Sequence, residues 1–595
     1  MKQCSQRLLG ISVKGVLILL LVSIFMMSSA GGLMAVEAAT AAICSEGMNC
    51  IFLPVISDRI QSDLVLNGIE VTQAVQDGNN SVPLVAGRST VVRVFTESFG
   101  EVSRFSNFKV SLTARRDGVD LTGEPVSLVS ALPVLSSRSD YSSTVNFQLP
   151  QSWLSGTVEL TVRVDPDNLI PESDEGNNTI TQTFTFHPMP PLQITIVPIQ
   201  YTHQPNGHTY PAPDKDTISD WIRRTYPVSH VEVTWHPPYF FEGDLSGADS
   251  VAQFSKLLNI VTTLKRDENA PSNQVYYGLV PVSDSSSTWF YGGVAGIGWI
   301  NNRAAVGLNT SNSAGQIAAH EIGHNMGMSH TPCGSAAGAD EKYPYADGSI
   351  GQYGLDVFSG TLYNPSKMKD VMSYCNPKWI SDYTYKTIFD NQVKKGGAAR
   401  PAGQLQTQVA TDQAAENATG LRGLMVRAQL DDGGAQLQPV YVLLGRASFD
   451  PNEGEYQVEL LNSKNERVGL WDVQAREIEM EGGQLKAIHA LIPLPDQPVS
   501  GLRLLKDGQV LAERPIEVIT MNKVLNVSTE PLEDGVLIRW GGIDDRPVII
   551  RYTTDGGKTH TTLAVDVTGR RYQVSDSQLP GPDGTFEVIP SDTWR

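Results

Sequence analysis

Three of the ten histidines of this chain fall in one short stretch, HEIGHNMGMSH, which runs from His320 to His330. If the stretch begins in a helix, His320 and His324 are one turn apart and both imidazoles can reach one metal ion. Glu321 stands beside them and can accept a proton from a water molecule without being a ligand. Gly327 can end the helix in a left-handed turn, so that the chain doubles back and His330 supplies a third nitrogen. Three histidines with an open fourth position are the pattern of a catalytic zinc site.

A helix must present these side chains, and the sequence NSAGQIAAHEIGHNMG predicts one. Ser313 and Gln316, three residues apart, fit a capping box at its start, and no proline interrupts the helical stretch after them. The residues around it mix helical periodicity, as in ADSVAQFSKLLNIVTTLKRD, with strand-like runs such as QVYYGLVPVS. This mixture over residues 189–399 predicts one α+β domain.

The histidine stretch matches the extended motif His-Glu-x-x-His-x-x-Gly-x-x-His, and DVMSYC lies beyond it at residues 370–375. With these residues the chain resembles the metzincin zinc endopeptidases, whose second mark is a methionine-containing turn beneath the metal. The resemblance implies Zn²⁺ held by His320, His324 and His330. It also implies Glu321 as the catalytic general base and Met372 in the turn. Taken alone, a methionine at this position is most often a core side chain.

Tyr374 lies two residues after Met372, as in the astacin and serralysin branches of the metzincins. The resemblance gives Tyr374 a catalytic role, in which its hydroxyl ligates zinc and then moves to stabilise the oxyanion. The alternative is a hydroxyl that is simply hydrogen-bonded in a turn. The branch stays open, because EIGHNMGMSH is close to the adamalysins, whereas Thr331 replaces their usual aspartate and MSY points to the serralysins.

A glycine-rich stretch, YGGVAGIGWINNRAAVGLN, precedes the predicted helix. In metzincins a strand in this region edges the cleft and pairs with extended substrate. The resemblance therefore assigns Gly292, Gly293, Gly296 and Gly298 to substrate approach. The alternative is a glycine-rich loop without substrate contact.

The amino terminus is typical of a secretory signal. Basic residues are followed by the apolar run VLILLLVSIFMM and by the small residues SSA. An apolar run of about 12 residues is short of the ~20 that span a bilayer. Residues 1–38 are therefore predicted to be a signal peptide, cleaved between 30 and 39, and the protein to be secreted. The alternative is an uncleaved segment that anchors the protein in a membrane.

The five cysteines fit an oxidising compartment. Cys4 belongs to the signal, Cys44 and Cys50 are close enough to pair, and Cys333 and Cys375 remain as a second pair. A bond between Cys333 and Cys375 would tie the third histidine to the methionine turn, and two buried thiols are the alternative. The segment CSEGMNC does not match the matrixin cysteine-switch wording, so no thiol switch is expected.

The net charge and the length of the chain limit which partners and how many domains are expected. Its 45 Lys and Arg against 64 Asp and Glu give a net charge of −19, and no compact basic run offsets it. Nucleic acid is therefore not expected as a partner. A length of 595 residues is too great for one hydrophobic core, so several domains are expected.

Alternating runs such as STVVRVFTES and TVELTVRVD predict β-sandwiches on both sides of the α+β domain. The runs AGRSTVVRV and VRVDPDNLIPESDEGNNTITQTFTF resemble the CARDB family, an Ig-like module of bacterial surface and secreted proteins. The strand tryptophan Trp540 and the turn at 555–557 resemble a fibronectin type III-like or Ig-like sandwich. The predicted fold class is multidomain, with an α+β metzincin-like catalytic domain flanked by all-β Ig-like or fibronectin-like sandwiches. The predicted boundaries are 1–38 for the signal peptide, 39–63 for a linker, 64–188 for the CARDB-like sandwich, 189–399 for the metzincin-like peptidase domain, 400–520 for a β-sandwich, and 521–595 for the last β-domain.

The closing turn of the CARDB-like segment is acidic. Its carboxylates could bind Ca²⁺ as oxygen ligands, although no regular loop spacing supports a calcium site. A solvated turn is the alternative. The residues concerned are Asp165, Asp167, Glu172, Asp174 and Glu175.

Together these patterns predict a secreted or surface zinc-dependent endopeptidase that acts on protein or glycoprotein. The β-sandwich domains would be available for contact with a cell surface or matrix. The alternative is a surface adhesin or binding protein with a catalytically silent zinc site. The presence of Glu321, which is dispensable for binding metal, favours the enzyme.

Overall fold

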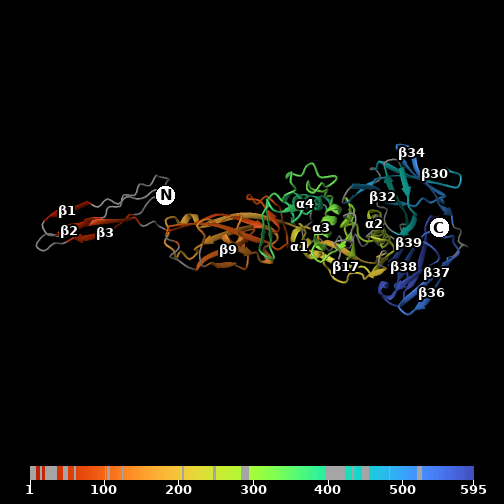
Figure 1. Cartoon of the computed structure of the whole chain (residues 1–595), viewed down its shortest axis with the longest axis horizontal. Helices are drawn as coiled ribbons and strands as arrows, with labels where there is room; N and C mark the ends of the chain where they lie inside the picture. The colour runs from red at the N-terminus through yellow and green to blue at the C-terminus, as the bar shows by residue number, and fades with distance from the viewer. Residues whose placement is uncertain are drawn as a thin grey trace.

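The computed structural model describes residues 62–594 with gaps, and it gives the backbone alone for four strands before residue 62. The modules follow one another along the long axis in chain order, and two C-terminal modules lie together at the end opposite the N-terminus (Figure 1). The early strands form two antiparallel hairpins: β1 (Leu9–Val13) with β2 (Val16–Leu20), and β3 (Val36–Ile43) with β4 (Ile51–Asp58). The gaps are 101, 103–106, 124, 130–131, 204–206, 246–249, 283–293, 397–421, 432–433, 445–453, 481–482 and 519–524.

The first module is a sandwich of two mainly antiparallel sheets. Alternation in sequence becomes alternation in burial, as in β9, where FKVSLTARR turns every second side chain into the core. Trp153 and Leu112 are fully buried between the sheets. One sheet has the order β12-β8-β5, and the other β10-β9-β13-β14-β7 with β11 also on β9. The strands are β5 (Asp63–Thr72), β7 (Leu84–Val85), β8 (Val91–Phe99), β9 (Phe108–Arg116), β10 (Val119–Asp120), β11 (Val126–Val129), β12 (Val145–Gln148), β13 (Gly156–Val164) and β14 (Thr179–His187).

The middle module is built on a mostly parallel sheet. Its strands β15 and β19 are buried along most of their length, because both faces of this sheet are covered by helices. Helix α2 packs on one face, while α1, α3 and α4 pack on the other. The helices are α1 (Ser219–Thr225), α2 (Ser250–Asp267), α3 (Ala314–Asn325) and α4 (Asp382–Gly396). The strands are β15 (Leu192–His203), β16 (His208–Tyr210), β17 (Val231–Trp235), β18 (Tyr239–Phe241), β19 (Val275–Pro281), β20 (Gly296–Trp299), β21 (Ala304–Asn309), β22 (Tyr353–Asp356), β23 (Thr361–Tyr363), β24 (Lys369–Asp370) and β25 (Lys378–Trp379).

Within this sheet β19 lies parallel to β15 and to β21, and β20 is antiparallel to β21. Strand β20 pairs on its other edge with β31 (Arg476–Met480), which belongs to the next module. The sheet therefore continues across residue 400, where the sequence predicts a domain boundary. One hydrophobic cluster spans the junction, with Phe254 and Trp299 on one side and Tyr441 and Ile549 on the other.

The remaining strands form the two C-terminal modules. The first of them contributes β31, β32 and β26 to the shared sheet and packs a second sheet, β30-β29-β33-β34, against it. The last module is a sandwich of β36-β37-β40 and β39-β38-β41 around Trp540. The strands are β26 (Arg422–Asp431), β27 (Gly434–Leu437), β28 (Tyr441–Leu444), β29 (Tyr456–Leu461), β30 (Arg467–Val473), β32 (Gly483–Pro493), β33 (Gly501–Lys506), β34 (Gln509–Pro515), β35 (Glu517–Val518), β36 (Asn526–Leu532), β37 (Gly535–Gly541), β38 (Val548–Thr553), β39 (Thr561–Val567), β40 (Arg571–Ser575), β41 (Thr585–Pro590) and β42 (Thr593–Trp594).

The first module is also locked to the middle one. Its strand β6 (Val75–Gln76) pairs antiparallel with β22, and the indole nitrogen of Trp379 donates to the carbonyl of Ala74 (2.8 Å). Arg88 donates to two carbonyls at the end of α1, those of Arg223 (2.7 Å) and Arg224 (2.8 Å). Buried backbone groups are thus satisfied across the junction. The prediction of a multidomain, strand-rich protein is confirmed.

Candidate metal centre

Helix α3 positions the first two histidines. It begins at Ala314, and its first turn is closed by the amide of Ile317 donating to the carbonyl of Ser313 (2.9 Å). The predicted capping box is wrong, because the Ser313 side chain makes no capping bond and its hydroxyl instead meets that of Thr310 at 2.6 Å. His320 and His324 lie one turn apart on this helix and are both buried.

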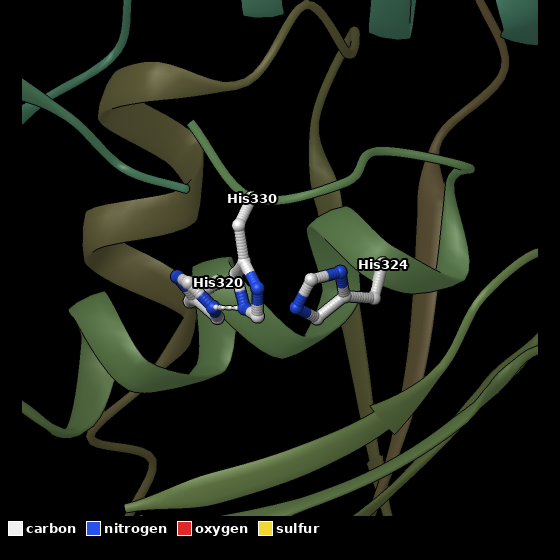
Figure 2. Close-up of side chains that lie close together, drawn as sticks. All are labelled: His320, His324 and His330. Carbon is white, nitrogen blue, oxygen red and sulfur yellow. Dashed lines mark hydrogen bonds between the residues drawn. The ribbon is translucent and has the colours of Figure 1, made fainter. Parts of the chain in front are cut away.

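The structure brings His320, His324 and His330 together. One ring nitrogen of each lies within 4.8 Å of the others, and among the described residues this is the one group of three or more His, Cys, Asp or Glu side chains close enough to hold a metal ion. The imidazoles point toward a common centre (Figure 2). The Nε2 atoms of His320 and His330 are 3.2 Å apart. Two nitrogens bound to a tetrahedral zinc, each at about 2.0–2.1 Å, would be about 3.3 Å apart, so this pair fits that ion.

Backbone carbonyls orient the three rings. A carbonyl can only accept, so each Nδ1 must carry the proton and each Nε2 keeps its lone pair for a metal. The Nδ1 partners are the carbonyl of Val371 for His320 (2.8 Å), that of Met328 for His324 (2.8 Å) and that of Ala337 for His330 (3.1 Å).

Burial also keeps two of the rings neutral. It lowers the pKa of His320 well below the usual 6.5, and it lowers the pKa of His324 to about 3. A charged imidazole has no lone pair at Nε2, so this lowering favours the protonation state that binds metal.

A left-handed turn at Gly327 brings the third histidine back. Its φ is +94°, and its amide donates to the carbonyl of His324 (2.9 Å) at the helix end. A Cβ here would approach the side-chain oxygen of Asn301 to 2.6 Å. Both the backbone conformation and the close neighbour therefore require glycine. The structure places Gly327 in the turn that the spacing predicts.

A buried turn lies beneath the histidines. Met372 is fully buried, and its sulfur lies so close to α3 that a Cβ on Gly323 would collide with it. Asp370 holds the turn: its carboxylate accepts from the amides of Met372 and Ser381, each at 2.8 Å. Asp370 was not among the residues predicted from the sequence. Its only signal in the sequence is its position at the start of DVMSYC, and the structure adds that its carboxylate is fully buried and must therefore accept hydrogen bonds.

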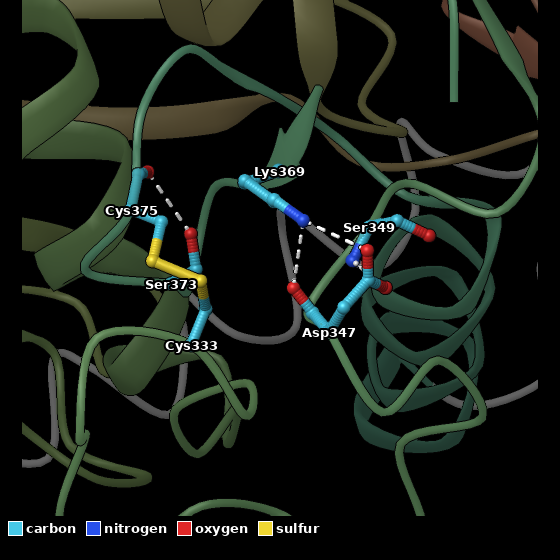
Figure 3. The surroundings of a disulfide bond; sticks show 6 residues. All are labelled: Cys333, Asp347, Ser349, Lys369, Ser373 and Cys375. Atoms are coloured by element: carbon cyan, nitrogen blue, oxygen red, sulfur yellow. Dashed lines mark hydrogen bonds and ion pairs between the residues drawn. A yellow bond between two sulfur atoms is a disulfide. The ribbon is translucent and has the colours of Figure 1, made fainter. Parts of the chain in front are cut away.

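Tyr374 follows the turn and approaches the triad. Its ring centroid lies 4.6 Å from that of His330 and 6.0 Å from that of His320. Cys333 and Cys375 form the predicted disulfide, which joins the segment after the third histidine to the buried turn (Figure 3).

Glu321 faces β20. A Cβ on Gly296 would come within 2.6 Å of the Glu321 Oε1, and one on Gly298 within 2.7 Å of the Glu321 carbonyl oxygen. These glycines therefore let the helix carrying Glu321 lie directly against the strand. Gly298 is paired with Glu479 of β31. Gly292 and Gly293, which were also assigned to substrate approach, lie outside the described residues.

The acidic turn of the first module does not converge on a metal-holding group within the described residues. Its carboxylates instead accept protein hydrogen bonds: Glu172 from the amide of Leu64 (2.6 Å) and the side chain of Asn178 (2.9 Å), and Asp174 from the amide of Gly176 (2.8 Å). Burial raises the pKa of Glu172 to about 7. Calcium binding here stays an untested prediction.

A buried three-histidine centre with an adjacent glutamate offers ligands for a metal ion and a carboxylate that could act as a general base, as metal-dependent hydrolases require. Residues 136–418 match the family model described as Peptidase M66, a zinc metallopeptidase family, and residues 61–182 match that of CARDB. The first match covers the whole centre and supports a zinc-dependent peptidase. A comparison with curated proteins gives no match.

Two solved structures illustrate the structural comparisons. One is the CARDB domain of a Pyrococcus furiosus protein in complex with di-metal ions, which is 15% identical to this chain. The match covers 21% of this chain and 94% of the solved domain, with a TM-score of 0.15. The other is a Parabacteroides merdae β-glucuronidase, which is 9% identical to this chain. The match covers 91% of this chain and 75% of the β-glucuronidase chain, with a TM-score of 0.13. Among the residues that the structure describes, no helix combines the length and hydrophobicity needed to cross a membrane.

Proposed function

We propose that this protein is a secreted zinc endopeptidase of the metzincin type, which hydrolyses peptide bonds of extracellular proteins. The observation that carries the proposal is the convergence of His320, His324 and His330 beside Glu321, with each Nδ1 held by a carbonyl. The Peptidase M66 match over the same residues supports a metal-dependent peptidase. Export is proposed from the signal-like amino terminus.

The three imidazoles would hold the ion, and Zn²⁺ there would polarise the scissile carbonyl and make a water molecule more acidic. Glu321 would take the proton of the attacking water and then deliver it to the leaving amine, acting first as general base and then as general acid. Its burial, with 5% of its surface exposed, protects this transfer from bulk solvent. Tyr374, beside His330, would donate a hydrogen bond from its hydroxyl to the oxyanion that develops at the carbonyl.

Several neighbouring groups would serve geometry alone. Asp370 holds Met372 under the triad, and the disulfide joins the two chain segments that meet there. Because a catalytic site tolerates little misplacement, these contacts keep the three nitrogens converged.

The test compares wild type with Glu321→Gln, using zinc content and cleavage of a mixed peptide library. The substitution removes the general base and should lower kcat/KM by about 10²–10⁴-fold while zinc stays bound. Glu172→Gln removes a carboxylate far from the triad in sequence and should keep full activity.

Cleavage by Glu321→Gln at the wild-type rate would contradict the proposed mechanism. Zinc binding without cleavage by the wild type would favour a binding protein with a silent metal site. Absence of zinc from the purified wild type would remove the basis of the proposal.

A further inference from the structure

The outer edge of β20, beside Glu321, is partly covered by the chain itself. Strand β31 lies antiparallel along it, with Gly298 opposite Glu479 and Trp299 opposite Ile478. The amide of Ile300 donates to the carbonyl of Glu477 (3.1 Å), and a guanidinium nitrogen of Arg476 donates to the carbonyl of Asn301 (2.6 Å). The pairing thus runs from Asn301 back to Gly298.

The alternation of a strand shows which residues of β20 face this edge. The amide of Leu308 on β21 donates to the carbonyl of Ala295, so Ala295 faces the inner neighbour. Gly296, Gly298 and Ile300 therefore turn their amides and carbonyls to the outer edge. Among the residues that the structure describes, the last pair with β31 is that of Gly298, and Gly296 is the next position that faces this edge.

Gly296 is also the residue of β20 closest to the catalytic carboxylate, since its Cβ position lies 2.6 Å from the Glu321 Oε1. A peptide bond under attack beside Glu321 would therefore lie close to Gly296. Strand β31 leads along β20 toward this point, and β32 then carries the chain away from it.

The direction of a substrate strand along β20 determines which substrate residues β31 would exclude from this edge. A substrate strand added antiparallel to β20 would run as β31 does, with its amino-terminal part beside Ile300 and Gly298. Its carboxy-terminal part would continue past Gly296 toward Val294. The positions beside Ile300 and Gly298 are already taken by Glu477 and Glu479.

We propose that β31 occupies the place of the substrate residues that precede the cut bond, so that substrate recognition rests on the residues after that bond. This inference rests on the proposed peptidase function. It makes the C-terminal module part of the substrate groove, because the chain upstream of the cut has to leave the edge of β20 where β31 lies along it. Extended peptides and loops with bulky upstream groups become acceptable substrates.

Strand β31 is held in place by contacts with the middle module, so that it can form a fixed border of the substrate groove. Ile478 is 2% exposed and belongs to the same hydrophobic cluster as Trp299. The indole of Trp299 donates to Thr262 of α2 (2.8 Å), and Arg266 of the same helix donates to the carbonyl of His489 on β32 (2.8 Å). Both strands of the hairpin are therefore anchored to the middle module.

The experiment begins with a peptide from a mixed library that purified wild-type protein cuts at one bond. Two series are then made, one shortened residue by residue before the cut and one after it. Removing upstream residues beyond the first should change kcat/KM by less than about threefold, because no strand pairing is lost there. Removing downstream residues should lower kcat/KM by about tenfold or more for the first two.

Two variants locate the cause. Glu479→Pro removes the backbone N–H at the last β31 pair, whereas Glu479→Ala changes the same side chain and keeps the N–H. Glu479→Pro should make upstream residues contribute about threefold or more to kcat/KM, and Glu479→Ala should behave as wild type. Thermal unfolding and zinc content establish that each variant is folded.

The outcomes separate the two proposals. Failure of the wild type to cut any peptide rejects the peptidase function itself. If kcat/KM depends on the upstream residues as strongly as on the downstream residues, or more strongly, the proposed role of β31 is rejected. The wild-type series decides this even if Glu479→Pro does not fold. A uniform rise in activity of Glu479→Pro on all peptides also rejects it, because the strand would then be an inhibitory cover.

Discussion

The histidine triad and the acidic turn of the first module are both groups of potential metal ligands, and they end in opposite states. In the triad every Nδ1 is used by a backbone carbonyl, and the three Nε2 atoms are left to converge. In the turn the carboxylates of Glu172 and Asp174 accept from protein groups. Ligand chemistry is therefore not enough: a metal site needs second partners that direct the ligand atoms inward.

The largest difference expected between the two regions is in zinc content. His324→Ala removes one of three converging nitrogens and should reduce bound zinc from about one per chain to near zero after dialysis. Glu172→Ala should leave zinc content unchanged. Elemental analysis of both variants measures this, and equal losses would erase the distinction between the regions.

The disulfide should stabilise the triad region. It closes a segment with a sequence separation of 42, and its removal in Cys333→Ala/Cys375→Ala should lower the free energy of unfolding by about 2–4 kcal/mol. Urea unfolding with and without reductant measures the effect. Reductant should destabilise the wild type and leave the double variant unchanged; an equal response of both would contradict the prediction.

Acid should destabilise the triad when metal has been removed. Because the folded-state pKa of His324 is lowered to about 3, its neutral ring contributes stability above pH 6.5 that is lost as pH falls toward 3. Chelator-treated protein should lose on the order of 2 kcal/mol between pH 7 and 4, measured by urea unfolding. His324→Phe should flatten this slope, and His230→Gln, at an exposed histidine, should keep it. An unchanged slope in His324→Phe would be the contrary result.

The acidic turn should respond to pH with the opposite sign and by less. Burial raises the pKa of Glu172 from 4.5 to about 7, so its contribution is present below pH 4.5 and is lost as pH rises through 7. Glu172→Gln should raise the free energy of unfolding at pH 8 by about 1 kcal/mol, a value reduced because the side chain is part-exposed. Glu175→Gln, at an exposed neighbour, is the control. A stabilisation of Glu172→Gln that is equal at pH 4 and pH 8 would exclude this titration.

Local spacing made much of the site predictable. Two histidines four residues apart on a helix must share a face, and Gly327 was expected in the left-handed turn where it is found. The disulfide could be predicted because few cysteines remained to pair. The capping box failed for a local reason too, since the Ser313 hydroxyl has a competing partner in Thr310.

Other features could not be read from the sequence. Asp370 joins Met372 to Ser381 through one carboxylate, and nothing in DVMSYC says which amides it will meet. The covered edge of β20 was also beyond sequence reasoning, because Glu479 lies far along the chain from Gly298 and both belong to ordinary strand patterns.

The sequence by itself was enough to predict the candidate ligand set, the proposed general base and the turn that returns His330, because each depends on the geometry of a few consecutive residues. The tertiary structure decided which nitrogen of each imidazole faces the common centre, how deeply the rings are buried and which edge of β20 is covered by β31. These properties depend on contacts between residues remote in sequence, and such contacts form only when the modules pack together.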